Sequence, residues 1–383
     1  MRVAMVVPGF SAHPGDWAIP ALQNLIVALA GHHQVHLFSL RYPAKGTYRF
    51  GNFNHTAIGG GQQFGWRSAS IYSQTARAIA QQHRRTPFDL VHAFWADEPG
   101  LAAALAAQFI RRPLVVRLGG WDLTNVPQIK YGAQRILSRR LMVAYALHRA
   151  AAIQANSAYQ VKQCEEQNLP PAKVHYIPAG VDIERFQPPA EKPSFDAPKL
   201  VQAASLIPVK NQALLFEIVA QVARRYPATE LHLAGVGTLE SELRALADRC
   251  NITQNIVWHK KIAYPNIPQL YHNSHLYVQT SWHESQGMAV LEAMACGLPV
   301  VGTPVGVVPE VACQPAAWSA DALAAQILSA FEDANCYNVW SQQARQTVMD
   351  RFSVPVVVGQ LLRLYEEVVA NRSMLLPLRP DLE

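Results

Sequence analysis

The segment from Ser274 to Pro309 constrains the fold of this chain more than any other. Residues 274–280 alternate apolar and polar side chains, which predicts a strand. Residues 288–296 contain neither Gly nor Pro and end at Gly297-Leu298-Pro299, which predicts a helix that stops there. Residues 298–303 resume as a short apolar strand. The predicted order is therefore strand, loop, helix, strand.

The loop and the helix start of this segment carry groups that suit a particular ligand. A helix that begins near Gly287 directs unpaired N–H groups and a positive dipole end toward the space above the strand, where anions bind. Gly287 lets the backbone approach a ligand closely. Glu284 in the loop and Glu292 in the helix offer acceptors for hydroxyl groups. A ligand with phosphates and hydroxyls, such as a nucleotide sugar, fits this set.

Residues 281–309 resemble the retaining glycosyltransferases of family 4 in the GT-B class. In that family, two glutamates separated by seven residues precede the phrase A-M-A-x-G-x-P-V. Here Glu284 and Glu292 have that spacing, and residues 293–300 complete the phrase. The spacing alone would be weak, since two glutamates eight positions apart occur on many surface helices. The alternative is that Glu292 is a solvated helix residue and Glu284 a loop charge.

The resemblance assigns roles to the residues of this segment. It implies that Glu284 contacts the donor sugar and that Glu292 binds the ribose hydroxyls. It also implies that the backbone of Gln286, Gly287 and Met288 meets the donor.

Length and composition limit the other possibilities. A chain of 383 residues exceeds the roughly 250–300 residues at which one core stops growing, so two domains are expected. A net charge of +6 favours anionic partners, such as nucleotide diphosphates or anionic lipid. No nucleic-acid-binding pattern is present, so no nucleic acid is expected as a partner. Five scattered cysteines and the lack of a long apolar run predict a cytoplasmic protein.

A proline-rich segment at residues 187–198 divides the chain and is predicted to be an exposed linker. The predicted fold class is α/β of the GT-B type, with two Rossmann-like domains whose parallel sheets face each other across a cleft. Residues 1–186 are expected to form the acceptor-side domain and residues 199–355 the nucleotide-sugar-binding domain. The resemblance implies that residues 356–383 cross back to the first domain.

The N-terminal end predicts a second corner that suits anions. A strand at residues 2–7 is followed by a Gly-containing loop and a helix at 17–30, for which Asp16 is the expected N-cap. The resemblance implies that Gly15 approaches the donor phosphate or the acceptor. Residues 41–67 are expected to be irregular, and either border the acceptor site or form a surface excursion.

Two further strands, at residues 89–94 and 113–118, alternate with a helix at 100–109. This order predicts a parallel sheet that binds ligands at the C-terminal ends of its strands. His92 is interpreted as a structural polar residue. Asp122 follows the second strand and is a candidate for binding an acceptor hydroxyl; the alternative is a loop or cap aspartate.

Residues 130–152 are predicted to form one long helix with Arg135, Arg139 and Arg140 near one another. One interpretation places this helix on an anionic membrane surface, as in some lipid-modifying relatives. The other is a solvated basic face over the core.

The second half supplies the remaining candidates for donor binding. By resemblance, Lys210 binds the donor diphosphate. Gly235 begins a G-x-G at the end of a predicted strand, where a nucleotide would lie. His259 begins a segment that is expected to line the base pocket.

Three positions depart from the family pattern. Ser205 stands where the family has an arginine on the diphosphate, and Gly119 stands where it has a histidine near the reacting centre. Ser285-Gln286 replaces a usual Gly-Phe. The base, the sugar and the acceptor are therefore left open.

These observations predict a glycosyltransferase that moves a sugar from a nucleoside diphosphate sugar to an acceptor hydroxyl with retention of configuration. The expected acceptor is a sugar or a lipid-linked molecule, in polysaccharide, glycolipid or glycoconjugate synthesis. Glu284, Lys210 and Asp122 are the predicted catalytic residues, and Lys210 and the helix start at Gly287 would stabilise the leaving diphosphate.

No Asp-x-Asp phrase is present, so no divalent ion is expected to be required. No cofactor is expected beside the donor substrate. Two alternatives remain open. One is a nucleotide-sugar epimerase or hydrolase of GT-B fold. The other is a non-catalytic two-domain protein that binds sugar nucleotides.

Overall fold

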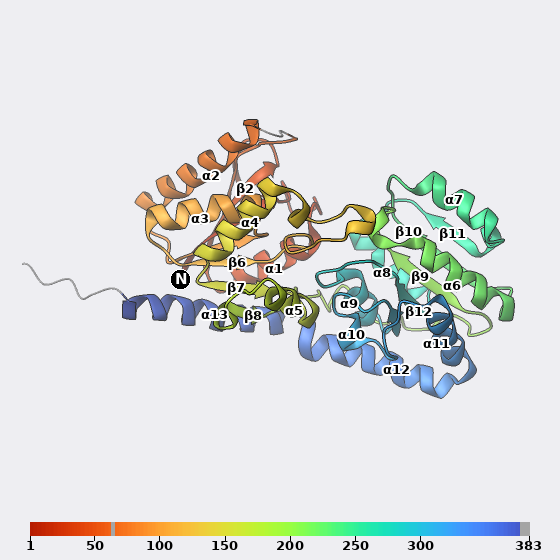
Figure 1. Ribbon diagram of the computed structural model, residues 1–383. Helices are drawn as coiled ribbons and strands as arrows, with labels where there is room; N and C mark the ends of the chain where they lie inside the picture. The colour runs from red at the N-terminus through yellow and green to blue at the C-terminus, as the bar shows by residue number, and fades with distance from the viewer. Residues whose placement is uncertain (63–65, 376–383) are drawn as a thin grey trace, which may run out of the picture.

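The computed structural model describes residues 1–62 and 66–375. The chain forms two lobes, each built around a β-sheet with helices on both faces (Figure 1). The first sheet uses strands from residues 2–176 and the second uses strands from residues 199–302. The predicted α/β fold with two parallel-sheet domains is confirmed. The exact domain boundaries stay a prediction.

The first sheet has eight strands in the order β3-β4-β2-β1-β5-β6-β7-β8. All neighbours are parallel except β3 and β4, which pair as an antiparallel hairpin at one edge. The strands are β1 (Arg2–Gly9), β2 (Gln34–Tyr42), β3 (Gly46–Phe50), β4 (Phe53–Ala57), β5 (Leu90–Phe94), β6 (Leu114–Arg117), β7 (Ala152–Ala155) and β8 (Val174–Tyr176).

The second sheet is parallel throughout, in the order β11-β10-β9-β12-β13. Its central strand β9 lies between β10 and β12, so the chain reverses its direction of winding there. Such a reversal opens a crevice at the carboxyl ends of the strands, where ligands bind. The strands are β9 (Lys199–Ala203), β10 (Glu230–Ala234), β11 (Ile256–His259), β12 (Leu276–Gln279) and β13 (Val300–Gly302).

Helices cover both faces of each sheet. They are α1 (Pro20–Ala30), α2 (Trp66–Arg85), α3 (Glu98–Ile110), α4 (Leu137–Arg149), α5 (Ala158–Glu166), α6 (Gln212–Arg225), α7 (Glu240–Arg249), α8 (Ile267–His272), α9 (Met288–Ala295), α10 (Val308–Val311), α11 (Ala320–Glu332), α12 (Ala334–Thr347) and α13 (Val354–Leu375). None of the helices in the described ranges is both long and apolar enough to span a bilayer.

The last helix, α13, belongs to the core of the first lobe. It runs along that lobe beside α1 (Figure 1), and Leu361 and Tyr365 are buried against Leu25 and the face of β1. The Tyr365 hydroxyl lies 2.6 Å from Nδ1 of the fully buried His92. The chain therefore returns to the first sheet after completing the second, and His92 lies in the core away from the cleft.

Two expectations for the first half are wrong. Residues 41–67 are not irregular throughout, because they include the hairpin of β3 and β4; residues 63–65 lie outside the described residues. Asp16 is not the cap of α1, whose N-cap is Ile19. Its carboxylate instead accepts hydrogen bonds from the Ala12 N–H and the Tyr42 hydroxyl, both at 2.8 Å.

The long helix predicted at residues 130–152 is also wrong. α4 begins only at Leu137, after two short 3₁₀ turns at Pro127–Ile129 and Ala133–Arg135. Gly132 has a φ of +119°, which is incompatible with a helix, so the backbone breaks there. Arg139 points into the protein, so the three arginines do not form one surface patch.

Candidate active site

Two adjoining cavities lie between the lobes. The smaller has a volume of about 340 Å³ and is lined by residues of both lobes, including Arg117, Lys210 and Glu284. The larger has a volume of about 720 Å³ and includes Glu292. Six residues line both cavities, which makes them one continuous cleft: Ile19, Ala21, Ala203, Ala204, Met288 and Ala289.

Glu284 is held by three hydrogen-bond donors on one oxygen. Its Oε1 accepts from Lys210 Nζ at 2.5 Å, from Ser281 Oγ at 2.8 Å and from Gln279 Nε2 at 3.0 Å. Burial alone would raise the pKa of Glu284, but the Lys210 ammonium and these hydrogen bonds lower it below its usual value. The carboxylate is therefore charged at neutral pH, and the structure places Glu284 and Lys210 side by side on the smaller cavity.

The N-terminus of α9 opens into the same cavity. Gly287 is its N-cap with a φ of +95°, a backbone conformation that favours glycine. Among the described residues, no side chain caps this helix, and residues 286–289 line the cavity. The unpaired N–H groups of the first turn and the helix dipole therefore give this wall a positive potential. The predicted backbone of Gln286, Gly287 and Met288 thus lies beside Glu284.

Glu292 lies one turn further along α9 and faces the larger cavity. Burial raises its pKa to about 8, and the Tyr264 hydroxyl, which hydrogen-bonds the carboxyl, opposes the increase. Gly15, from the first lobe, and Gly235, at the end of β10, line the same cavity. The structure therefore brings these three predicted residues together around one space.

Two predicted residues do not line the cleft. The side chain of His259 stacks on His232, with ring centroids 5.3 Å apart, while the following residues Lys261 and Ile262 line the larger cavity. Asp122 is fully buried behind the smaller cavity.

Asp122 holds together two loops of the cavity wall. One of its oxygens accepts hydrogen bonds from the Ala96 N–H at 2.8 Å and from the Gly119 N–H at 2.6 Å. Asp122 lies in the loop after β6, is fully buried, and is not among the residues that line the smaller cavity. Its role toward an acceptor hydroxyl stays a prediction.

The unusual Ser285-Gln286 pair connects the two lobes. The Gln286 side chain donates to the Ala179 carbonyl at 2.9 Å and accepts from the Ala179 N–H at 2.7 Å. The Ser157 hydroxyl donates to the Ser285 carbonyl at 2.6 Å. His283 Nε2 lies 2.7 Å from the carbonyl of Gly120 in the first lobe. These positions therefore fix how the lobes meet at the cleft, a role that local sequence did not indicate.

Two residues of the smaller cavity were missed by sequence reasoning. Trp95 follows β5, and Arg117 ends β6. The only signal for Arg117 was a charged residue within an apolar strand, and nothing local marked Trp95.

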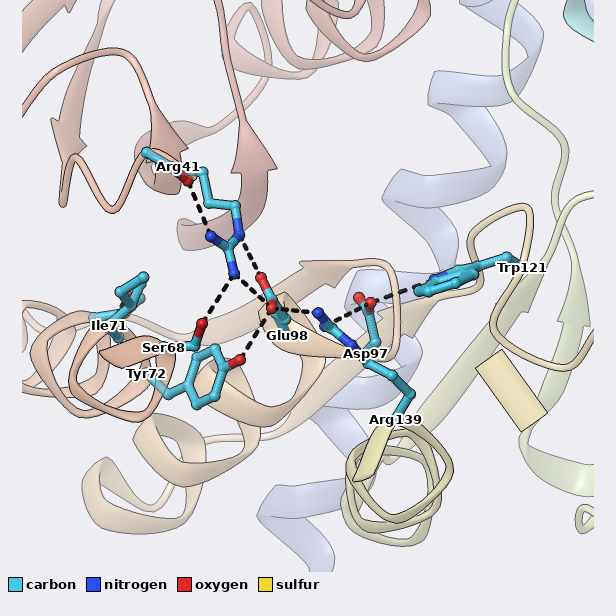
Figure 2. A network of polar contacts seen from close by, with 10 residues as sticks. Arg41, Ser68, Ile71, Tyr72, Asp97, Glu98, Trp121 and Arg139 are labelled. Carbon is cyan, nitrogen blue, oxygen red and sulfur yellow. Dashed lines mark hydrogen bonds and ion pairs between the residues drawn. The ribbon is translucent and has the colours of Figure 1, made fainter. Parts of the chain in front are cut away.

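A polar network supports the loop that carries Trp95. Figure 2 shows Glu98 between two arginines, with Arg41 Nε at 2.6 Å and Arg139 Nη2 at 2.7 Å from its carboxylate. Arg139 also reaches Asp97 at 3.2 Å, and the Trp121 indole donates to the same Asp97 oxygen at 3.3 Å. The network ties the start of α3 to α4 and to the loop after β6, next to the segments that carry Trp95 and Gly119.

Family models match most of the chain. The model described as Glycosyltransferase Family 4 matches residues 21–185, and the one described as Glycosyl transferases group 1 matches residues 184–347. Their boundary falls between the two sheets. With the two facing parallel-sheet domains and the glutamate pair beside the cleft, the chain belongs to the GT-B glycosyltransferases of family 4 type.

Individual relatives are similar to different shares of this chain. One phosphatidylinositol N-acetylglucosaminyltransferase subunit of Arabidopsis thaliana is 32% identical over 143 residues, which is 37% of this chain and 32% of that protein. N-acetyl-alpha-D-glucosaminyl L-malate synthase of Bacillus anthracis is 24% identical over 313 residues, covering 77% of this chain and 79% of that protein. The chain thus spans about a third of the plant relative's length and most of the bacterial one.

Solved structures share the fold. Sucrose-phosphate synthase from Thermosynechococcus elongatus superposes with a TM-score of 0.77 at 16% identity, over 97% of this chain and 100% of that one. HepE of Anabaena, solved in complex with UDP and glucose, superposes with a TM-score of 0.72 at 19% identity, over 96% of this chain and 100% of that one.

Proposed function

We propose that this protein transfers a sugar from a nucleoside diphosphate sugar to an acceptor hydroxyl, with retention of configuration. The observation that carries the proposal is the convergence of Lys210, Glu284 and the N-terminus of α9 on one cavity. A second cavity continues from it to a buried carboxyl, Glu292. Cation, amides and carboxyls at this spacing match a diphosphate flanked by two sets of hydroxyl groups.

The donor would occupy both cavities. Its ribose would bind Glu292 in the larger cavity, and its phosphates would lie over the start of α9 near Met288, which lines both spaces. Its sugar would then reach Glu284 in the smaller cavity. Lys210 and the α9 amides would stabilise the negative charge that develops on the diphosphate as the glycosidic bond breaks.

Retention is proposed to occur by attack on the face that the diphosphate leaves. Three donors on Oε1, including the Lys210 ammonium, stabilise the negative charge of Glu284 and so weaken this carboxylate as a nucleophile. In the proposed reaction, the acceptor oxygen bonds to the anomeric carbon, the bond to the diphosphate breaks, and a phosphate oxygen takes the acceptor proton. The anomeric configuration of the product, measured by NMR, tests this step; an inverted product would overturn it.

The names of the relatives support an acceptor hydroxyl on a small acid or a lipid headgroup. The plant relative is named for phosphatidylinositol and the bacterial one for L-malate. The complex of HepE with UDP and glucose supports a nucleotide-sugar donor. We propose the same classes of donor and acceptor here.

Peripheral membrane contact is proposed at the start of α4. Leu137 and Leu141 are 61% and 60% exposed there, one turn apart and beside the exposed Arg140. An exposed apolar pair next to a cation suits the surface of an anionic bilayer. Flotation with vesicles containing anionic lipid tests the contact: Leu137→Glu with Leu141→Glu should reduce the bound fraction, and equal binding would exclude this surface.

The central experiment is a binding and turnover series. Calorimetry with UDP, GDP and ADP should show one nucleotide that binds the wild type, and Glu292→Ala should weaken that binding at least about tenfold. Unchanged affinity would remove Glu292 from the site. Incubation with the matching sugar nucleotides then separates transfer from the alternatives: consumption without an acceptor indicates an epimerase or hydrolase, and no consumption with any acceptor indicates a binding protein.

A further inference from the structure

Trp95 has an unusual backbone at the wall of the smaller cavity. Its φ is +83°, in the left-handed region that side chains other than glycine rarely adopt, and the residue is 37% exposed. Such strain persists only where the surroundings hold it, and it concentrates at functional sites. The strained backbone therefore keeps a large aromatic side chain at the mouth of the site.

Gly119 makes room for this side chain. A Cβ atom on Gly119 would lie 2.5 Å from Cδ1 and 2.7 Å from Cγ of the Trp95 indole, so any other residue here would collide with the ring. Gly119 and Trp95 are thus a matched pair, because a glycine at position 119 leaves the space that the indole fills.

Hydrogen bonds fix the backbone that carries the indole. The backbone N–H of Trp95 donates to the Arg117 carbonyl at 2.8 Å. On either side, Ala96 and Gly119 donate to the buried carboxylate of Asp122. The aromatic surface is therefore preorganised and needs little ordering when a ligand binds.

Arg117 lies beside Trp95 with an incomplete set of partners. Its Nε donates to Asn156 Oδ1 at 2.8 Å, and its guanidinium carbon lies 5.8 Å from the centre of the Phe94 ring. Within residues 1–62 and 66–375, no carboxylate forms an ion pair with it. Burial lowers the pKa of Arg117 to about 10, so it remains a cation at neutral pH. A guanidinium that lines the cavity and has no carboxylate as its own ion-pair partner among the described residues suits an anionic ligand.

We propose that Trp95 and Arg117 form the acceptor subsite, and that the acceptor is a polyhydroxylated ring that carries a carboxylate or a phosphate. The ring packs its apolar C–H face on the indole, and the anionic group binds the guanidinium. Both residues belong to the first lobe, whereas Lys210, Glu284 and Gly287 belong to the second. The inference rests on the proposed function and names the acceptor class for the same site.

The test measures binding of matched ring compounds to the protein saturated with its nucleoside diphosphate. The probes are methyl glucoside, glucuronate and glucose 6-phosphate. The binding of each probe is measured by calorimetry and by quenching of tryptophan fluorescence. We expect the two anionic probes to bind at least about tenfold more tightly than the neutral one, and Arg117→Gln to abolish that preference. Trp95→Gly should weaken the binding of all three probes. Because glycine adopts this backbone conformation without strain, the melting temperature of the variant should stay within a few degrees of the wild type.

Exposed residues away from the cleft provide the controls. Arg249→Gln and Phe109→Ala, the latter at a side chain that is 66% exposed on α3, should leave all probe affinities unchanged. The subsite is refuted if the anionic probes bind no more tightly than methyl glucoside, or if Arg117→Gln weakens nucleoside diphosphate binding as much as Lys210→Met does, since Arg117 would then belong to the donor site. Absence of nucleoside diphosphate binding in the wild type would instead refute the proposed function itself.

Discussion

Glu292 illustrates how a residue proposed to bind the donor can reduce stability. Its pKa rises from an ordinary 4.5 to about 8 because the carboxyl is buried. Between these two values the folded protein binds more protons than the unfolded chain, so the free energy of unfolding falls as pH rises. Below pH 4.5 the carboxyl is protonated in both the folded and the unfolded state, so its burial no longer lowers the free energy of unfolding. Each pKa unit corresponds to about 1.4 kcal/mol.

Glu292→Gln should therefore stabilise the protein at pH 8 by about 2–4 kcal/mol and have little effect near pH 4.5. Melting temperatures across this pH range measure the difference, with the exposed Glu217→Gln as the matched control. The burial of this carboxyl would be contradicted if the difference in melting temperature between Glu292→Gln and the wild type grew as pH falls. An equal difference for the Glu217→Gln control would contradict it as well.

The Lys210–Glu284 pair makes a second prediction at this scale. Lys210→Met leaves a mostly buried carboxylate without its cation and should destabilise the protein by about 1–3 kcal/mol. Adding Glu284→Gln removes that uncompensated charge, so urea denaturation should show partial recovery of stability. Transfer activity should not recover, because both groups are proposed to act on the donor. Additive losses of stability in the double variant would argue against the pairing.

Local spacing made some site residues predictable and left others hidden. Glu284, Gly287 and Glu292 lie within one short segment, so their sequence separation nearly determines their positions in space. Trp95 depends on the space left by Gly119, which follows the neighbouring strand β6, and no local pattern reveals that packing.

At the scale of elements, α13 joins the end of the chain to the first lobe. Tyr365→Phe removes the buried hydroxyl that contacts His92 at 2.6 Å and should cost about 1–2 kcal/mol in the free energy of unfolding. Tyr145→Phe is the control, because its hydroxyl bonds Gln108 at an exposed position. Denaturation curves that show an equal loss for both would indicate that the α13 contact adds nothing. Nucleotide affinity should be the same in both variants.

Element predictions failed where backbone conformation overrides composition. Residues 130–152 contain enough good helix formers to suggest one helix, but the φ of Gly132 ends that possibility. The hairpin of β3 and β4 turns at Gly51-Asn52, between Phe50 and Phe53. A two-residue Gly-Asn connection between alternating segments is a recognised hairpin signal, so this element was predictable from sequence.

For the whole molecule, the reaction is expected to need no divalent metal. The charge of the leaving diphosphate would be met by Lys210 and the amides at the start of α9. Turnover measured in excess EDTA should equal turnover with added Mg²⁺ or Mn²⁺. A loss of activity in EDTA that either ion restores would contradict this expectation.

The two-domain architecture was largely predictable because strands and helices alternate along the whole chain. How the two lobes meet was not predictable, since it depends on pairs far apart in sequence, such as Ser157 with Ser285. The two family models divide the chain at a similar place, because one ends at residue 185 and the other begins at residue 184.

The double hydrogen bond between Gln286 and Ala179 has a mechanical consequence. It fastens the lobes one residue away from Gly287, at the spot where the phosphates are proposed to rest. A rotation of one lobe relative to the other must either keep these two hydrogen bonds and turn about them, or break them. Release of the nucleoside diphosphate would then be coupled to the relative movement of the lobes. A substitution at Gln286 should therefore change the turnover rate even when every group proposed to contact the sugar is intact.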